Sequence, residues 1–354
     1  MTCSDRPQMF YLPNTMANWP WPRRINPFFE EVKAEVDEWF RSFNALSQKS
    51  LKAFEKCDFV RLAALSYPDA SRAEHLRIGC ELMIVYFIVD EYTDVEDADR
   101  AAEMVDIIID ALKNPHRPRP EGEVILGEII KQFWSRAIQS ASLTSQQHFL
   151  DDYITYLRAV IVEAGDRDKN ATYDIQGYLS IRRQTVGAQS AFAIFELGLN
   201  LVDEVYYHPA VTELIDCAAE LILIDNDLAS YNREQGTGDE NHNLVTAIMF
   251  ELGLDRSGAM AWAAAYHTEI EARFINGLLK LPSWGAKLDA QLKEYLNGIA
   301  NWARANYCWS YESQRYFGSR GGEIEKTRLV PLLLKARRDP KLREQDIVVA
   351  DLQL

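Results

Sequence analysis

An acidic cluster follows an apolar run in the segment FIVDEYTDVED, residues 87–97. On a helix through residue 94, Met83, Phe87, Asp90 and Asp94 share one face, because their spacings are four, three and four. Carboxylates one helical turn apart repel each other, and their hard oxygens suit Mg²⁺, whose coordination substrate phosphates usually complete. The cluster therefore indicates a magnesium site, although a solvated helix end has the same composition and is the commoner explanation of an isolated acidic cluster.

A second set of oxygen ligands lies in LIDNDLASYNRE, residues 223–234. Asn226, Ser230 and Glu234 are spaced by four and four, so they follow one helical face with a drift of about 40° per step. An amide, a hydroxyl and a carboxylate form a mixed oxygen set that fits one more hard cation. This spacing recurs by chance in helical proteins, but together with the first cluster it is specific.

Helices must position both clusters, because apolar residues recur at intervals of three and four through most of the chain. Convincing alternation at period two is absent, and the connections are short and rich in Gly, Pro, Asn and Asp. The sequence therefore predicts an all-α fold. The expected helices cover residues 27–43, 74–94, 101–113, 123–138, 145–164, 173–199, 210–234, 243–252, 258–279 and 286–316.

The first 27 residues differ from the rest because five prolines exclude a long helix there. We expect residues 1–27 to form an extended arm and residues 28–354 to form a single helical domain, since no connection is long enough for an interdomain linker. The arm also carries Trp19 and Trp21, so it could pack over the mouth of a site that closes.

Composition and charge exclude several classes of function. The chain has 354 residues, 47% of them hydrophobic, and a formal net charge of -15, which argues against binding to a nucleic-acid backbone. Five cysteines show neither a CxxC pair nor metal-ligand spacing to histidine. The N-terminus does not resemble a secretory signal, and no apolar stretch reaches the ~18 residues needed to span a bilayer. We therefore expect a reduced, cytoplasmic protein without a membrane span.

Four motifs, taken in order along the chain, resemble those of class I terpene synthases. DEYTD (90–94) resembles the aspartate-rich motif of that family, and NDLASYNRE (226–234) resembles its second metal motif, the NSE triad. RRQTVG (182–187) resembles the segment with the diphosphate-sensing arginine, and Arg315-Tyr316 is similar to the pair that closes these sites. The chain is most similar to basidiomycete sesquiterpene synthases, which include enzymes that make protoilludene.

The resemblance implies a single-domain helical bundle around a central cavity that binds three Mg²⁺ ions. Asp90 would bridge two of the ions, whereas Asp94 would tune the site through a salt bridge more than by ligation. Asn226, Ser230 and Glu234 would hold the third ion.

The same resemblance assigns the groups that bind the diphosphate. Arg183 would be the sensor, because the family places a linker residue three positions later and a helix-breaking effector four positions later, here Val186 and Gly187; Arg182 is its rival. The other expected donors to the diphosphate are Arg233, at a position where the family often has Lys, and Arg315 and Tyr316. The aromatic wall of the cavity is expected to include Phe87 and Trp309.

The implied reaction is the ionisation of farnesyl diphosphate to a carbocation, which cyclises to a sesquiterpene hydrocarbon or alcohol such as protoilludene while diphosphate is released. A homodimer is left open. One alternative is a chain-elongating prenyl diphosphate synthase, which shares the fold but uses two aspartate-rich motifs. Another is a non-catalytic helical scaffold, against which the complete set of ligand residues argues.

Overall fold

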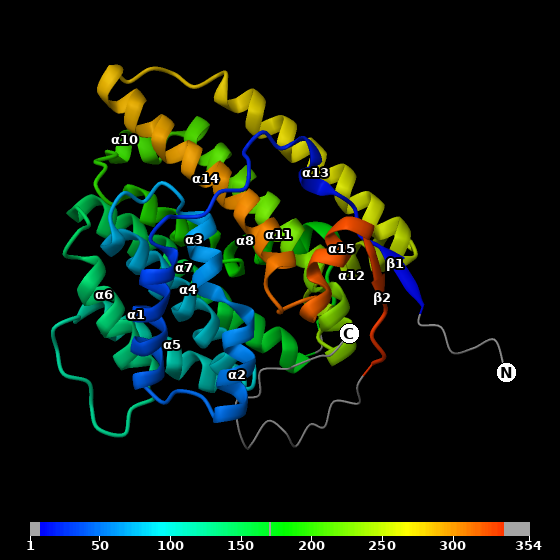
Figure 1. Ribbon diagram of the computed structural model, residues 1–354, viewed down its shortest axis with the longest axis horizontal. Coiled ribbons are helices and arrows are strands. Elements are labelled where there is room, and N and C mark those ends of the chain that lie inside the picture. Colours follow the sequence, from blue (N-terminus) through cyan, green and yellow to red (C-terminus); the bar gives the residue numbers. More distant parts are fainter. Residues whose placement is uncertain (1–7, 170, 336–354) are drawn as a thin grey trace.

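The computed structural model describes residues 8–169 and 171–335 (Figure 1). Most of these residues are helical, which confirms the predicted all-α fold. The longer helices are α1 (Phe29–Ser42), α2 (Gln48–Cys57), α3 (Phe59–Ser66), α4 (Ala73–Thr93), α5 (Ala98–Lys113), α6 (Leu126–Ala137), α7 (Leu143–Lys169), α8 (Ile175–Thr185), α11 (Pro209–Thr237), α12 (Leu244–Leu252), α13 (Arg256–Leu278) and α14 (Ala286–Glu312). The shorter elements are β1 (Met9–Tyr11), η1 (Thr15–Asn18), α9 (Ala188–Phe192), η2 (Ala193–Glu196), α10 (Asp203–Tyr206), η3 (Glu240–His242), η4 (Gly318–Arg320), α15 (Gly321–Thr327) and β2 (Leu329–Pro331).

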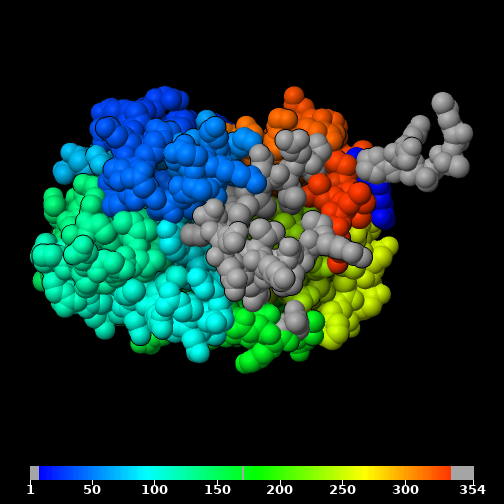
Figure 2. All heavy atoms as spheres, turned by 90° about the horizontal axis from the view of Figure 1, so that it is seen from below, coloured from blue at the N-terminus to red at the C-terminus, as the bar shows by residue number. Residues whose placement is uncertain are grey.

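Two groups of helices pack into one bundle. On the N-terminal side, α4 packs against α1 and α3, while α5 packs against α6 and α7; on the C-terminal side, α11 packs against α13 and α14. The contacts of α14 with α3 and of α7 with α8 join the two groups. Figure 2 shows the same division at the surface, with the blue-to-cyan helices on one side and the yellow-to-red segments on the other. The helices that carry the two predicted metal motifs, α4 and α11, therefore belong to opposite groups.

Local sequence explains why α4 and α11 reach the centre of the bundle. Both helices are apolar around most of their circumference and bury most of their residues, which is typical of helices surrounded by other helices. The helix α11 begins at Pro209, which needs no backbone donor in the first turn, and is capped by Gly238 in the left-handed conformation (φ 86°). It thus runs without interruption through the second motif.

The expected single helix over residues 173–199 is wrong. The helix α8 ends at Thr185, and Gly187 adopts a φ of 68°, after which α9 and η2 continue the chain. A Cβ atom on Gly187 would lie 2.8 Å from the ring of Tyr86, so both the backbone angle and the neighbouring ring favour glycine. Gly187 therefore lies four residues after Arg183 and five after Arg182.

Other differences concern short elements. The sequence did not predict α2 and α3, which are joined at Asp58 in the left-handed conformation (φ 48°), or the pair of strands β1 and β2. It also ended the helix over 145–164 too early, because α7 continues to Lys169. Apart from the broken helix, each of the other expected helices corresponds to a helix in the structure, with shifted ends.

The described part of the N-terminal arm lies against α13 and α14. The strand β1 pairs antiparallel with β2, and η1 contacts α13 (Figure 1). Trp19 is buried and its Nε1 donates to the carbonyl oxygen of Ala300 on α14, 2.9 Å away. No residue of 8–27 lines the cavity described below, so these residues do not occupy the position expected of a lid. Residues 1–7 of the arm and 336–354 of the expected domain lie outside the described residues.

None of the helices in the described part of the chain is long and apolar enough to cross a membrane. Cys57, Cys80, Cys217 and Cys308 are free and buried. The cytoplasmic location expected from the sequence stays a prediction.

Candidate active site

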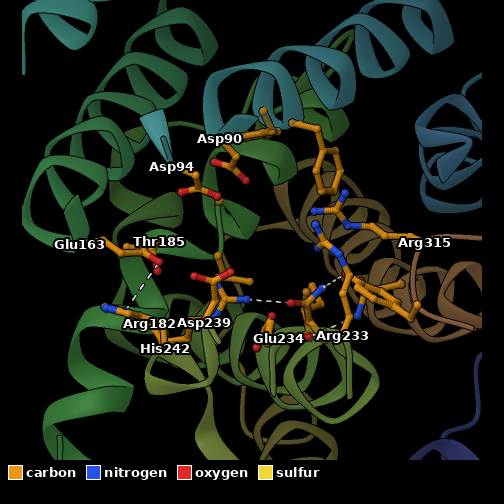
Figure 3. A pocket seen from close by; sticks show the side chains of 18 of the residues that line it. Asp90, Asp94, Glu163, Arg182, Thr185, Arg233, Glu234, Asp239, His242 and Arg315 are labelled. Atoms are coloured by element: carbon orange, nitrogen blue, oxygen red, sulfur yellow. Dashed lines mark hydrogen bonds and ion pairs between the residues drawn. The ribbon is translucent and has the colours of Figure 1, made fainter. Parts of the chain in front are cut away.

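One cavity of about 260 Å³ lies between the two groups of helices. Its apolar wall comes from α3, α4 and α14, and its polar end holds carboxylates and guanidinium groups. In Figure 3, Asp90 and Asp94 face Arg233 and Glu234 across the cavity, and Arg315 approaches from one side. The apolar wall includes Leu62, Met83, Phe87, Trp302 and Trp309. The structure thus brings most of the predicted site residues to a single space.

The acidic motif on α4 is only partly neutralised. The hydroxyl of Tyr156 donates to Asp90 Oδ1 at 2.7 Å, and Arg167 lies 3.1 Å from Asp94 Oδ1. Burial raises the pKa of Asp90 to about 6, and the hydrogen bond from Tyr156 opposes that rise. The side chain of Asp94 therefore has the salt bridge that the family resemblance implied.

Desolvation and the nearby carboxylate of Asp90 also raise the pKa of Asp94, while Arg167 lowers it. Water reduces this rise, because 62% of the Asp94 side chain is exposed. Glu163 on α7 adds negative charge that raises the pKa of both aspartates. This end of the cavity therefore has more acidic groups than nearby cations to balance them.

The second motif on α11 is held by several hydrogen bonds. Arg182 donates to Asn226 Oδ1 at 2.8 Å, and Asn226 Nδ2 donates to the hydroxyl of Tyr316 at 2.8 Å. The side chain of Asn243 donates to Glu234 Oε2 at 2.8 Å and lies 3.4 Å from Ser230 Oγ. Asn226 and Glu234 line the cavity, whereas Ser230 is buried beside it.

Burial raises the pKa of Glu234 to about 7, and negative charge on Asp227 adds to the effect. The amide of Asn243 and the hydroxyl of Ser230 lower it by hydrogen bonding to the carboxylate. The three predicted ligands thus lie on one side of α11 and share one network.

The structure places Arg182, rather than Arg183, at the cavity. The guanidinium group of Arg183 turns to Glu220, with Nη2 2.5 Å from Oε1, and does not line the cavity. Arg182 lies 3.1 Å from Asp227 Oδ1 in addition to its bond with Asn226. Successive helical residues point about 100° apart, so only one of the two can face the diphosphate. This placement disagrees with the expectation that Arg183 is the sensor, and it favours Arg182.

Arg315 packs on the aromatic wall. Its guanidinium carbon lies 4.7 Å from the ring centre of Phe87 and 5.3 Å from that of Phe59. The closest carboxylate is Glu91, at 3.9 Å, and Arg315 Nε is buried without a hydrogen-bond partner in the described part of the chain. A free donor therefore remains beside the cavity.

Arg233 and Tyr316 complete the polar lining. Arg233 forms no ion pair with any residue between 8 and 335 that the structure describes. Tyr316 accepts the hydrogen bond from Asn226 and packs edge-on against Trp309, with ring centres 5.7 Å apart. The predicted donors Arg233, Arg315 and Tyr316 all line the cavity.

The two predicted aromatic residues lie together at the apolar wall. The ring of Phe87 stacks on Phe59 with centres 3.6 Å apart, and it lies 5.8 Å from Trp309. The indole nitrogen of Trp309 donates to the carbonyl oxygen of Cys57 at 2.8 Å, so its ring is fixed. Phe87 and Trp309 therefore both line the cavity and are not core residues remote from the site.

Sequence reasoning missed several lining residues. Tyr156, Glu163 and Arg167 are spaced by seven and four on α7, so a helical-face reading could have grouped them. Arg167 lies beyond the end of the expected helix over residues 145–164, so that helix could not place it. Asn243 carried no signal, because the contact with Glu234 depends on how the chain turns after Gly238.

Comparisons with known proteins agree with this geometry. Residues 81–273 match the family model for terpene synthase family 2, C-terminal metal binding. The chain is 56% identical to Delta(6)-protoilludene synthase 18 of Postia placenta over 97% of its length and 98% of that protein. It is 43% identical to Delta(6)-protoilludene synthase of Armillaria gallica, covering 93% and 95% of the two chains.

Solved structures show the same fold at low sequence identity. A single-residue variant of cucumene synthase superposes with a TM-score of 0.73 at 23% identity, covering 84% of this chain and all of that one (100%). An α-eudesmol synthase superposes with a TM-score of 0.74 at 22% identity, covering 84% and 98%. The fold, the matched family model and the similarity along nearly the whole chain lead to one conclusion: this chain belongs to the terpene synthase family.

Proposed function

We propose that this enzyme is a sesquiterpene synthase that uses Mg²⁺ to ionise farnesyl diphosphate and cyclises the resulting cation to protoilludene. The observation that carries the proposal is the 56% identity to two protoilludene synthases over 97% of the chain. The cavity supports it, because oxygen ligands on α4 and α11 face each other above an aromatic wall.

The residues present fit a cluster of hard cations. The side chains at the polar end offer carboxylate, amide and hydroxyl oxygens, which Mg²⁺ prefers. Burial raises the pKa values of Asp90 and Glu234, so a cation bound beside them would offset the cost of keeping these acids charged. Among the described residues, no three acidic, imidazole or thiol groups gather closely enough to hold an ion by themselves. Cations here would therefore take further oxygens from Asn226, Ser230 and the diphosphate.

We assign the three ions as the family resemblance implies. Asp90 would contact two of them, with Asp94 held back by Arg167, and Asn226, Ser230 and Glu234 would hold the third. When bound, the ions would neutralise the negative charge that develops on the diphosphate as it leaves.

The arginines would bind the diphosphate from two sides. Arg182 now donates to Asn226 Oδ1, so movement of Arg182 to another acceptor would leave that oxygen fully available to a cation. A diphosphate oxygen would be such an acceptor, and the free donors of Arg233 and Arg315 would add to it. Tyr316 accepts from Asn226 Nδ2, so its hydroxyl can still donate a hydrogen bond to the diphosphate.

After ionisation, the apolar wall would stabilise the cation and exclude water from it. Aromatic faces attract positive charge by about 0.5–2 kcal/mol each, and Phe87 and Trp309 present such faces below the metal motifs. An apolar cavity also keeps water from the cation, which would otherwise be trapped as an alcohol.

Incubation of the full chain with farnesyl diphosphate and Mg²⁺, followed by gas chromatography and mass spectrometry, tests the proposal. We expect protoilludene and free diphosphate, and no product without Mg²⁺. Longer prenyl diphosphates would identify a chain-elongating enzyme instead, and the absence of any turnover would favour a scaffold. A different cyclic sesquiterpene would keep the reaction class but overturn the assigned product.

A further inference from the structure

We infer that the two terminal segments, together called the brace, bond to residues of α11 that do not line the cavity, and so hold the metal-binding face of this helix toward the cavity. The brace consists of residues 8–21 and 329–333. It bonds two turns of α11, the first through Asp225 and the second through Asn232 and Gln235. This inference rests on the proposed function, because it concerns how Asn226, Arg233 and Glu234 reach a cation and a diphosphate.

The first contact reaches the helical turn that carries Asn226. Thr15, on η1 of the arm, donates its hydroxyl to Asp225 Oδ1 at 2.5 Å, and both side chains are buried. Asp225 directly precedes Asn226 and points about 100° away from it around the helix. Because both side chains are buried, loss of this bond would leave a polar group without its partner. The bond therefore favours the present orientation of α11 at this turn.

The second contact reaches the turn that carries Arg233 and Glu234. Asn232 is 1% exposed, and its side-chain amide pairs with the C-terminal segment as another strand would. Its Nδ2 donates to the carbonyl oxygen of Pro331 at 3.0 Å, and its Oδ1 accepts from the backbone nitrogen of Leu333 at 3.0 Å. Gln235 adds a bond from Nε2 to the carbonyl oxygen of Leu333 at 2.9 Å. Three bonds thus join this turn to the segment after β2.

The two contacts are linked to each other by the strand pair. Met9 lies opposite Pro331 in the register of β1 and β2, and the backbone nitrogen of Leu12 donates to the carbonyl oxygen of Arg328 at 2.8 Å. Figure 2 shows the dark blue residues of β1 against the red C-terminal segment. A displacement of either terminal segment would therefore be transmitted to the other.

The arm is also fastened to α14, which ends just before Arg315 and Tyr316. Arg304 on α14 donates to the carbonyl oxygens of Met16, Trp19 and Trp21, each at 2.8 Å. The brace consequently connects the helix with the second metal motif to the helix that leads to the two C-terminal site residues. Since partners behind a metal ligand orient it, this arrangement predicts an effect on cation binding and not merely on folding.

Isosteric variants separate positioning from stability. Thr15→Val removes the bond to Asp225 and keeps the volume, while Thr15→Ser keeps the hydroxyl. The matched control is Tyr307→Phe, which removes a bond of 2.9 Å from α14 to Asn14 of the arm but leaves the hydrogen bonds of Asp225 and Asn232 in place. Asn232→Ala tests the second contact. Each variant is measured for thermal stability without ligand and for calorimetric binding of inorganic diphosphate in the presence of Mg²⁺.

We expect Thr15→Val and Asn232→Ala to weaken Mg²⁺-dependent diphosphate binding by roughly tenfold. Thr15→Ser should restore the affinity, and Tyr307→Phe should leave it within about twofold even where its melting temperature falls. If Asn232→Ala does not fold, the Thr15 pair decides. Unchanged affinity in Thr15→Val, or losses that follow melting temperature in all variants, would overturn the brace alone. Failure of the unaltered chain to bind diphosphate with Mg²⁺ would instead overturn the proposed function.

Discussion

The helices α4 and α11 form two opposite walls at the polar end of the cavity, and their oxygen atoms differ in how many hydrogen-bond partners they have. On α4, the carboxyl groups of Asp90 and Asp94 have one tyrosine hydroxyl and one arginine as polar partners. On α11, Asn226 and Glu234 are held by side chains from α8, from Asn243 and from the segment after α14. The first wall offers charge with free coordination positions, whereas the second offers ligands in a fixed arrangement.

A protein can bind a cation in two ways, by negative charge or by ligands that hydrogen bonds hold in position, and the two walls differ in which of these they provide. A wall that lacks compensating charge attracts an ion by electrostatics, so its contribution depends on the number of carboxylates. A wall that is already hydrogen-bonded has its ligands oriented in advance, but a ligand such as Asn226 would exchange a present partner for the ion. Substitutions that remove charge should therefore matter most on α4, and substitutions that change partners should matter most around α11.

The largest effect is expected at Asp90. Asp90→Asn keeps the shape of the side chain but removes the charge that would hold two cations, so turnover of farnesyl diphosphate should fall by about 10²-fold or more. Kinetics across a Mg²⁺ titration measure the loss. Glu96→Gln is the matched control, because Glu96 is a nearby acid that does not line the cavity. Equal losses in both variants would mean that a diffuse acidic surface, and not a defined ligand on α4, attracts the cation.

The next effect distinguishes Arg182 from Arg183. Arg182→Ala removes the partner of Asn226 and the proposed donor to the diphosphate, so activity should fall by roughly tenfold to 10²-fold. Its melting temperature should fall as well, because the side chain of Asp227 is only 3% exposed and loses its cation. Arg183→Ala should keep activity within about twofold but lower the melting temperature, because the side chain of Glu220 is only 5% exposed and loses its cation. Kinetics and thermal unfolding of both variants give the comparison. The reverse result would restore Arg183 as the sensor and would mean that α8 rotates when substrate binds.

The metal motifs could be predicted from the sequence, because helical spacing alone determines which residues share a face. Asp90 with Asp94, and Asn226 with Glu234, needed nothing more than a correct helix. The choice between Arg182 and Arg183 could not be read in this way. Their partners, Asp227 and Glu220, come from another helix, and only the packing of α8 on α11 determines which arginine faces which acid.

The fold shows the same limit. Long amphipathic helices were predicted because their period extends over many residues, whereas α2 and α3 are too short to establish one. The prolines of the arm correctly excluded a long helix. Where the arm lies depends on Arg304 and on the pairing of β1 with β2, which join residues from opposite ends of the chain. Such long-range contacts leave no periodic signal.

The smallest expected effect is a dependence on pH that has opposite signs with and without metal. Burial raises the pKa of Asp90 to about 6, whereas an unfolded aspartate titrates near 4. A raised carboxyl pKa stabilises the metal-free fold below the unfolded value, and that contribution is lost as the pH rises through about 6. Metal binding has the reverse dependence, since Mg²⁺ must displace the proton and therefore binds more weakly at low pH.

Thermal unfolding of the unaltered protein and of Asp90→Asn between pH 5 and 8 separates the two signs. Without metal, the unaltered protein should lose stability relative to the variant as the pH rises. This loss should be on the order of 1 kcal/mol, because water in the cavity screens part of the ~1.4 kcal/mol per pKa unit. With Mg²⁺ and inorganic diphosphate, the unaltered protein should instead gain stability relative to the variant over the same range. Parallel curves in both conditions would show that Asp90 is already ionised in the metal-free protein. The contrast between the two walls would then rest on geometry alone, because the α4 wall would not differ from the α11 wall in its titration.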